Sequence, residues 1–119
     1  MANISASINE DTGTITWDTV EDADAALEQF VKGGRFTVEV NGTFDSATVD
    51  LHYGTVSGDL AAIDTDEKPD GLRFTSQGVA NLEIATGYIN PSISGGGASQ
   101  EVTIKLKPLD KATANANRT

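Results

Sequence analysis

The sequence predicts an all-β protein: an antiparallel β-sandwich, Ig-like or jelly-roll-like, of about eight short strands. Three observations support this fold class. Residues 35–53 alternate apolar and polar side chains, as the two strands of a half-buried hairpin do. Turn-forming residues recur at short intervals through the rest of the chain. The apolar stripes with a period near four that would indicate a helical bundle are missing.

The hairpin is the clearest element. Phe36, Val38 and Val40 alternate with polar residues, and so do Val49 and Leu51. Successive side chains of a strand point to opposite faces, so each half has one apolar and one polar face. Residues 41–46 (NGTFDS) lie between the halves and are rich in turn formers. The sequence therefore predicts a sheet with a core on one side and water on the other.

The chain before the hairpin divides into three predicted parts. Residues 1–13 alternate weakly and end in a turn signal, which predicts an N-terminal arm or an edge strand. Residues 14–17 are typical of a strand, with Ile15 and Trp17 on one face. Residues 18–31 are ambiguous, because their Ala-rich acidic middle could also begin a short helix. We interpret them as an acidic loop followed by a short strand near residues 27–31, ended by Gly33-Gly34.

After the hairpin the sequence predicts short strands at 60–63, 72–75, 79–85, 88–94 and 101–107. Pro91 cannot donate to a ladder, so the strand that contains it is predicted at a sheet edge. The sandwich domain is expected to span 14–107, and residues 108–119 to form a polar C-terminal tail. The predicted core residues are Phe36, Val38, Val40, Val49, Leu51, Val102, Ile104 and Leu106.

Composition limits the chemistry. The 119 residues include no Cys and a single His, and 18 acidic residues against 8 basic ones give a net charge of −10. That charge argues against nucleic-acid binding, which needs clustered Lys and Arg. No apolar run approaches membrane-spanning length, and the first residues lack the pattern of a signal peptide.

The two ends of the chain carry opposite charge. Residues 1–31 contain seven acidic residues and no basic one, whereas residues 102–119 contain four basic residues and one acidic. Residues 111–119 have no large apolar side chain with which to dock on their own domain. A neighbouring molecule is therefore expected to hold the tail, as an assembly arm.

Three features could carry chemistry, and each is interpreted without it. His52 lies on the polar face of its strand, and we interpret it as a solvent-facing or interface histidine. Four carboxylates lie in the loop Asp64–Asp70, but their spacing does not match a calcium loop, so no metal is expected. Gly95-Gly96-Gly97 lacks the Lys-Ser or Lys-Thr of a phosphate loop and is predicted to be a turn. The sequence thus predicts no catalytic residue and no cofactor.

Five segments resemble a group of small virion proteins of tailed bacteriophages. They are Thr16-Trp17 with the acidic stretch after it, Phe36–Val49, Leu72–Gly78, Tyr88–Gly96 and Val102–Leu106. The resemblance covers about residues 14–107. These virion proteins are β-sandwich modules, and the group includes candidate head decoration (cement) proteins.

The resemblance implies a non-enzymatic virion structural protein, made in the host cytoplasm and located on the capsid surface. Its expected partner is the major capsid protein or another virion protein, and it is expected to form a homo-oligomer such as a trimer. Neither nucleic acid nor a membrane is an expected partner. The residues expected at the interface are Met1, Ile4, Ile8, Phe44, Tyr88, Lys111 and Arg118.

Two other functions remain open from the sequence. A carbohydrate-binding sandwich module, of a tail fibre or a secreted enzyme, would need a platform of three exposed coplanar aromatic rings or a calcium loop. A small hydrolase would need a pocket into which two carboxylates converge.

Overall fold

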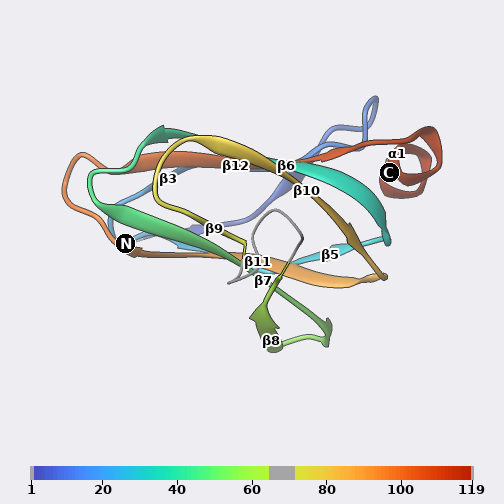
Figure 1. Ribbon diagram of the computed structural model, residues 1–119, viewed down its shortest axis with the longest axis horizontal. Coiled ribbons are helices and arrows are strands. Elements are labelled where there is room, and N and C mark those ends of the chain that lie inside the picture. The colour runs from blue at the N-terminus through green and yellow to red at the C-terminus, as the bar shows by residue number, and fades with distance from the viewer. Residues whose placement is uncertain (1, 65–71, 119) are drawn as a thin grey trace.

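The computed structural model describes residues 2–64 and 72–118 and confirms the all-β sandwich. Two five-stranded antiparallel sheets pack face to face (Figure 1). Sheet 1 has the strand order β10-β6-β12-β3-β2, and sheet 2 has the order β5-β11-β7-β8, with β9 also pairing with β7. The elements are β1 (Asn3–Ile4), β2 (Ser7–Ile8), β3 (Ile15–Glu21), β4 (Ala25–Ala26), β5 (Gln29–Val31), β6 (Gly34–Thr43), β7 (Ala47–Val56), β8 (Asp59–Ala62), β9 (Arg73–Phe74), β10 (Gly78–Ile84), β11 (Gly87–Gly95), β12 (Glu101–Pro108) and α1 (Lys111–Asn117).

The core lies between the two sheets. All eight core residues predicted from the alternation are fully buried, at 0% exposure. Trp17 is buried with them, and its Nε1–H donates to the Leu27 carbonyl oxygen at 2.8 Å. This bond satisfies the indole N–H, which would otherwise be costly to bury.

The hairpin turn is tighter than the predicted 41–46. Asp45 and Ser46 both have positive φ angles, 47° and 69°, and the Ala47 N–H donates to the Phe44 carbonyl oxygen at 2.8 Å. Two central residues with positive φ form a type I′ turn, whose twist matches that of the flanking strands. β6 therefore continues to Thr43, where it pairs with β12.

The predicted acidic loop at 18–26 is only partly correct. β3 continues through Asp18 and Thr19 to Glu21. A β-bulge at these two residues shifts its pairing with β12 between Val102 and Ile104. Asp18 and Thr19 together lie opposite Thr103, and the Thr19 N–H donates to Thr103 Oγ1 at 3.0 Å. The extra residue lets both Trp17 and Val20 point into the core. The strand expected near 27–31 is present as β5.

The N-terminal segment forms an edge strand, one of its two predicted alternatives. β2 pairs with β3 at the edge of sheet 1, and β1 pairs in parallel with β4. Ile4 and Ile8 are half-buried against the core. Residues 2–8 are therefore part of the domain rather than a free arm.

The expectation that the C-terminal tail needs a neighbouring molecule is wrong. Residues 111–117 form α1, which packs on β6 and β12 of its own domain. Asn117 accepts a hydrogen bond from the Lys32 N–H at 2.9 Å and donates to the Lys32 carbonyl oxygen at 3.0 Å. Thr113 Oγ1 accepts from the Arg35 N–H at 3.1 Å. Polar side chains dock this helix, so the lack of large apolar residues did not prevent docking.

Asp110 caps α1 and gives the helix a pH dependence. Its side chain accepts from the Thr113 N–H at 2.8 Å, and that hydrogen bond lowers the pKa of the Asp110 carboxyl below its ordinary value of 3.8. A lowered pKa in the folded state contributes stability above the ordinary pKa, which is lost as the pH falls through the lowered pKa. In Asp110→Asn the difference in melting temperature between pH 7 and pH 3 should therefore be smaller than in the wild type. An identical difference in both proteins would contradict this role for the cap.

Candidate functional site

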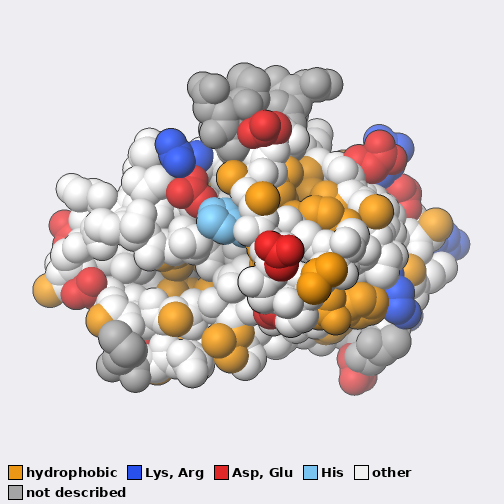
Figure 2. All heavy atoms as spheres, turned by 90° about the horizontal axis from the view of Figure 1, so that it is seen from below, with side chains coloured by type: hydrophobic (Ala, Val, Ile, Leu, Met, Phe, Trp, Pro, Cys, Tyr) orange, Lys and Arg blue, Asp and Glu red, His pale blue; other side chains and the backbone are white. Residues whose placement is uncertain are grey.

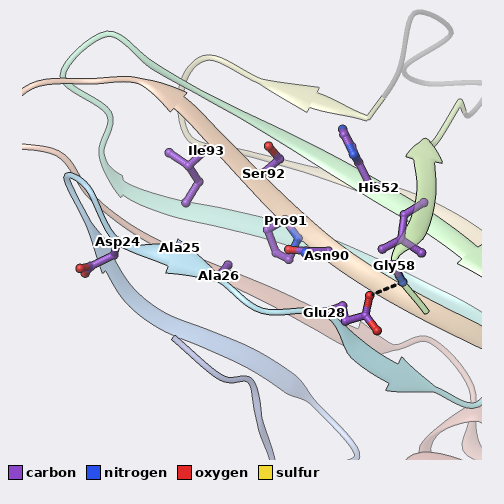
Figure 3. Close-up of a pocket in the computed structure, with 11 residues that line it drawn as sticks. Asp24, Ala25, Ala26, Glu28, His52, Gly58, Asn90, Pro91, Ser92 and Ile93 are labelled. Atoms are coloured by element: carbon purple, nitrogen blue, oxygen red, sulfur yellow. Dashed lines mark hydrogen bonds between the residues drawn. The ribbon is translucent and has the colours of Figure 1, made fainter. Parts of the chain in front are cut away.

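A groove of about 370 Å³ runs along β11 on sheet 2 (Figure 3). One wall is the segment 24–28, which contains β4, and the other comprises His52 of β7 with Gly58 and Leu60 of the β7–β8 hairpin. Residues 90–93 of β11 form the floor. Three segments that are distant in the sequence thus meet at one surface.

The groove exists because β5 is shorter than β11. β5 pairs with β11 only from Gly87 to Ile89, so no strand pairs with β11 beyond Ile89 on that side in the described part of the chain. The prediction that the Pro91 strand is an edge strand is therefore wrong for β11 as a whole, which lies between β5 and β7.

At Pro91 itself, however, the physical argument applies. The N–H and C=O of Leu51, its partner on β7, are bonded to Leu72 and Ile63, away from β11. Pro91 is therefore in a non-hydrogen-bonded pair with Leu51, and its nitrogen faces the side of β11 along which the segment 24–28 runs without ladder pairing. Proline is placed where a strand donor would have no ladder partner.

Two carboxylates line the groove, and both are held in place. Asp24 accepts from the backbone N–H groups of Ala2 and Glu21, each at 3.0 Å. Glu28 accepts from the Gly58 N–H at 3.0 Å and from the Ser57 hydroxyl, which ties the β7–β8 hairpin to the segment before β5. Figure 3 shows the two carboxylates at opposite ends of the groove. They are fixed charges that do not converge on one point.

The polar centre of the groove is formed by Asn90 and His52, which face each other across the β11–β7 ladder. With its amide nitrogen donating, Asn90 bonds the carbonyl oxygens of Ala26 at 2.9 Å and Pro91 at 2.7 Å. Asp50, the acid nearest to His52 along its face, accepts from Arg73 Nε at 2.7 Å. Asp50 is therefore engaged by a guanidinium rather than serving as an orienting acid for the imidazole.

The segments around the groove carry four apolar residues that we call the apolar rim: Leu27, Phe30, Val56 and Tyr88. Leu27, Phe30 and Val56 are 38%, 44% and 61% exposed, and they are among the few large apolar side chains that reach the surface. The Phe30 and Tyr88 rings pack edge to face, with centroids 5.3 Å apart. Figure 2 shows hydrophobic side chains gathered on this face of the molecule, with the imidazole of the single histidine beside them. Exposed clusters of this kind are typical of interaction surfaces.

Of the residues predicted at an interface, Tyr88 alone lies at this rim. Phe44 is 8% exposed and belongs to the core, so its expected surface position is wrong. Ile4 and Ile8 pack against the core, and Lys111 and Arg118 are exposed on and after α1. Met1 lies outside the described residues. So do residues 65–71, which hold all but Asp64 of the segment Asp64–Asp70 that was predicted to bind no metal.

Four residues at or near the groove were not predicted as site residues from the sequence: Asp24, Leu27, Glu28 and Phe30. The one signal in the sequence was the poor alternation of residues 27–30. These residues run from the groove wall into β5, which is only three residues long and so shows little alternation.

His52 is expected to be dispensable for folding. It is half-buried at the surface of sheet 2, and within residues 2–64 and 72–118 it makes no hydrogen bond like that of Glu28. His52→Ala should change the free energy of unfolding by less than about 1 kcal/mol, as measured by urea denaturation. A loss of several times that amount would show that the imidazole has a structural partner.

Within residues 2–64 and 72–118, no group of three or more His, Cys, Asp or Glu side chains could hold a metal ion. In the same residues no helix has the length and apolar character needed to cross a membrane.

No protein-family model and no curated protein matches the sequence. Among solved structures, the chain is similar to the crystal structure of PliG from Aeromonas hydrophila, a periplasmic inhibitor of g-type lysozyme. The TM-score is 0.53 at 13% sequence identity, and the match covers 89% of this chain and 95% of PliG. The likeness supports the sandwich fold over nearly the whole chain, and the similar protein is an inhibitor rather than an enzyme.

Proposed function

We propose that this protein is a non-enzymatic virion structural protein of a tailed bacteriophage, which decorates the capsid surface and bridges neighbouring capsid subunits. The observation that carries the proposal is the apolar rim of Leu27, Phe30, Val56 and Tyr88 beside the groove. Aromatic and large apolar side chains at the centre of a contact supply most of the binding free energy in protein interfaces.

The rest of the molecule supports a mechanical role. The sheets enclose a continuous core, and no side-chain nitrogen or oxygen buried within the described residues lacks a hydrogen-bond partner. The first residues and the last helix are both bonded to the domain. A body of this kind can bind with little rearrangement, which lowers the entropy cost of association.

A carbohydrate-binding module is less well supported. Of the seven aromatic residues, Trp17, Phe36, Phe44 and Phe74 are buried, and the Tyr53 hydroxyl donates to the Ala85 carbonyl oxygen. Phe30 and Tyr88 remain, and their rings are inclined by 66° to each other. Two inclined rings do not make the coplanar platform of three on which a sugar chain would stack.

A small hydrolase is also less well supported. The two carboxylates of the groove, Asp24 and Glu28, lie at its opposite ends and are bonded to backbone N–H groups (Figure 3). General acid–base hydrolysis requires two carboxyl groups that flank one bond.

The fold likeness to a lysozyme inhibitor favours one other candidate: an inhibitor that binds an enzyme through this surface. Both candidates are protein-binding roles, and the partner separates them. Capsid binding requires many copies on an ordered particle, whereas inhibition requires one copy on a soluble enzyme.

Copurification with full particles tests the proposal. Particles of the phage that encodes the chain, purified by density gradient, should contain the protein at a copy number comparable to that of the capsid protein. Its absence from particles would overturn the proposal, and inhibition of a g-type lysozyme by the purified protein at stoichiometric amounts would favour the second candidate.

A further inference from the structure

A second hollow, of about 520 Å³, lies on the outer face of sheet 1, over β2, β3, β12 and the turn between β2 and β3. Sites for small molecules commonly have volumes of about 300–1,000 Å³. Apart from Ile8, every described residue that lines this hollow has a polar side chain, and four of them are the hydroxyl residues Ser7, Thr12, Thr14 and Thr16. Such a lining suits a ligand that forms many hydrogen bonds.

Lys105 is a half-buried cation in this hollow, and it has no counter-ion. In the ladder it lies opposite Glu39 of β6, where a cross-strand ion pair is expected. Glu39 pairs instead with Lys107, two residues further along β12, at 3.2 Å. Within residues 2–64 and 72–118 the Lys105 ammonium makes neither an ion pair nor a hydrogen bond. A ligand that supplied an anionic group would therefore pair with it without breaking an existing contact.

Two hydroxyls lie in the same row of the sheet as Lys105. Ser7 of β2 pairs with Thr16 of β3, and Thr16 pairs with Lys105 of β12. Paired residues of a ladder have their side chains on the same face, so the row presents two hydroxyls beside the ammonium. In the described part of the chain the hydroxyls of Thr12 and Thr14 bond each other at 3.0 Å, whereas those of Ser7 and Thr16 make no hydrogen bond.

The β-bulge in β3 adds a hydrogen-bond acceptor to the same hollow. Asp18 lines the hollow, and its Oδ1 accepts from the hydroxyls of Thr19 at 2.9 Å and Thr103 at 3.3 Å. Both bonds use the same oxygen, so Oδ2 can accept from a ligand. Thr19 has a φ of 51°, which is uncommon for a β-branched residue, and β-bulges often serve to re-aim a side chain.

We propose that this hollow binds a sugar that carries a carboxylate, such as a uronic acid. The carboxylate pairs with the Lys105 ammonium, and the ring hydroxyls bond Ser7, Thr16 and Asp18. A neutral sugar would leave the charge of Lys105 unpaired. A protein segment fits less well, because Ile8 is the only apolar residue among the described lining residues, and protein contacts depend on large apolar and aromatic side chains.

The recognition proposed for this hollow uses hydrogen bonds and one charge. It needs no stacking on aromatic rings, so it is separate from the coplanar platform that the molecule lacks. It also lies on the opposite sheet from the apolar rim, so its success or failure leaves the proposed function untouched.

Titration of the isotopically labelled full chain with sodium glucuronate tests the proposal. Binding is followed by NMR at the amides of residues 14–18 and 103–107, with glucose and sodium acetate as comparison ligands at constant ionic strength. We expect glucuronate to shift these amides saturably and to bind at least about tenfold more tightly than either comparison ligand. Equal binding of acetate would show a site for any carboxylate, and equal binding of glucose would show that the charge is not read. Either result, or no saturable shift, would overturn the proposal.

Two variants and a matched control assign the contacts. Lys105→Met removes the ammonium but keeps an unbranched side chain, and it should weaken glucuronate binding at least about tenfold. Thr16→Val removes one hydroxyl from a strand position and should weaken binding about threefold. Lys111→Met makes the first change at an exposed position on α1, outside the hollow, and should bind within about twofold of the wild type.

Thermal melts accompany these titrations, so that lost binding is distinguished from lost folding. If Lys105→Met and Thr16→Val both bind glucuronate as the wild type does, the proposal is wrong. A peptide of four glutamates serves as the last comparison ligand. If it shifts the same amides and binds more tightly than glucuronate, the hollow is a site for acidic peptides and the proposal is also wrong.

Discussion

Val38→Asp is expected to leave the protein unfolded. Val38 is fully buried in β6, between the β10 and β12 partners Ala80 and Leu106. A carboxylate at this position would lie among the apolar side chains of the core, and its burial costs about 4–5 kcal/mol or more. That is a large part of the roughly 5–15 kcal/mol that stabilises a small domain. Circular dichroism and a thermal melt would show the loss of the cooperative transition.

Val79→Asp is the matched control for that experiment. Val79 lies on the neighbouring strand β10, but it is 61% exposed. The same chemical change there should alter the free energy of unfolding by about 0.5 kcal/mol or less. A Val38→Asp protein that melts cooperatively near the temperature of Val79→Asp would show that β6 has a different register from the one described.

Asn117→Ala is expected to give the second largest effect. The Asn117 amide bonds both the N–H and the C=O of Lys32 and the Thr113 carbonyl oxygen, and the side chain is 5% exposed. Its removal leaves two backbone groups at Lys32 without their partner, at about 1–3 kcal/mol each. We expect a loss of about 2–4 kcal/mol in the free energy of unfolding and a fall of about 10 °C in Tm.

Asn115→Ala is the control on the same helix. Asn115 is exposed, and its side chain accepts a hydrogen bond from Arg118 at 3.0 Å. Because alanine is the better helix former, this variant should be as stable as the wild type or slightly more stable. Equal destabilisation by both substitutions would show that the helix, rather than the Asn117 amide, is what matters.

The parts of the fold that are set by alternation could be predicted from the sequence. The eight predicted core residues come from β6, β7 and β12, where one residue faces the core and the next faces water without interruption. β3 could not be predicted in full, because the bulge at Asp18 and Thr19 breaks the alternation that defines a strand in sequence. Docking of α1 was missed for another reason: it depends on specific hydrogen bonds from Thr113 and Asn117, which have no signature in hydropathy.

The candidate site was less predictable than the core. Tyr88 was identified, but its partner Phe30 lies more than fifty residues away in a three-residue strand that the alternation hardly marks. The groove forms where β5 ends and β11 continues, so it depends on the difference in length between these two strands. Nothing in either segment alone carries that information.

The β-bulge in β3 has a consequence for the evolution of chain length. Insertions and deletions are normally tolerated in loops, because a one-residue change within a strand turns its inner face outward. In β3 the two residues Asp18 and Thr19 already occupy the place opposite the single residue Thr103. Deletion of Thr19 would therefore leave Trp17 and Val20 on the same face, in regular alternation, and would remove a residue with a φ of 51°. A relative that is one residue shorter at this point would keep the same core. A sequence alignment that places a gap in the middle of this buried strand would therefore be correct.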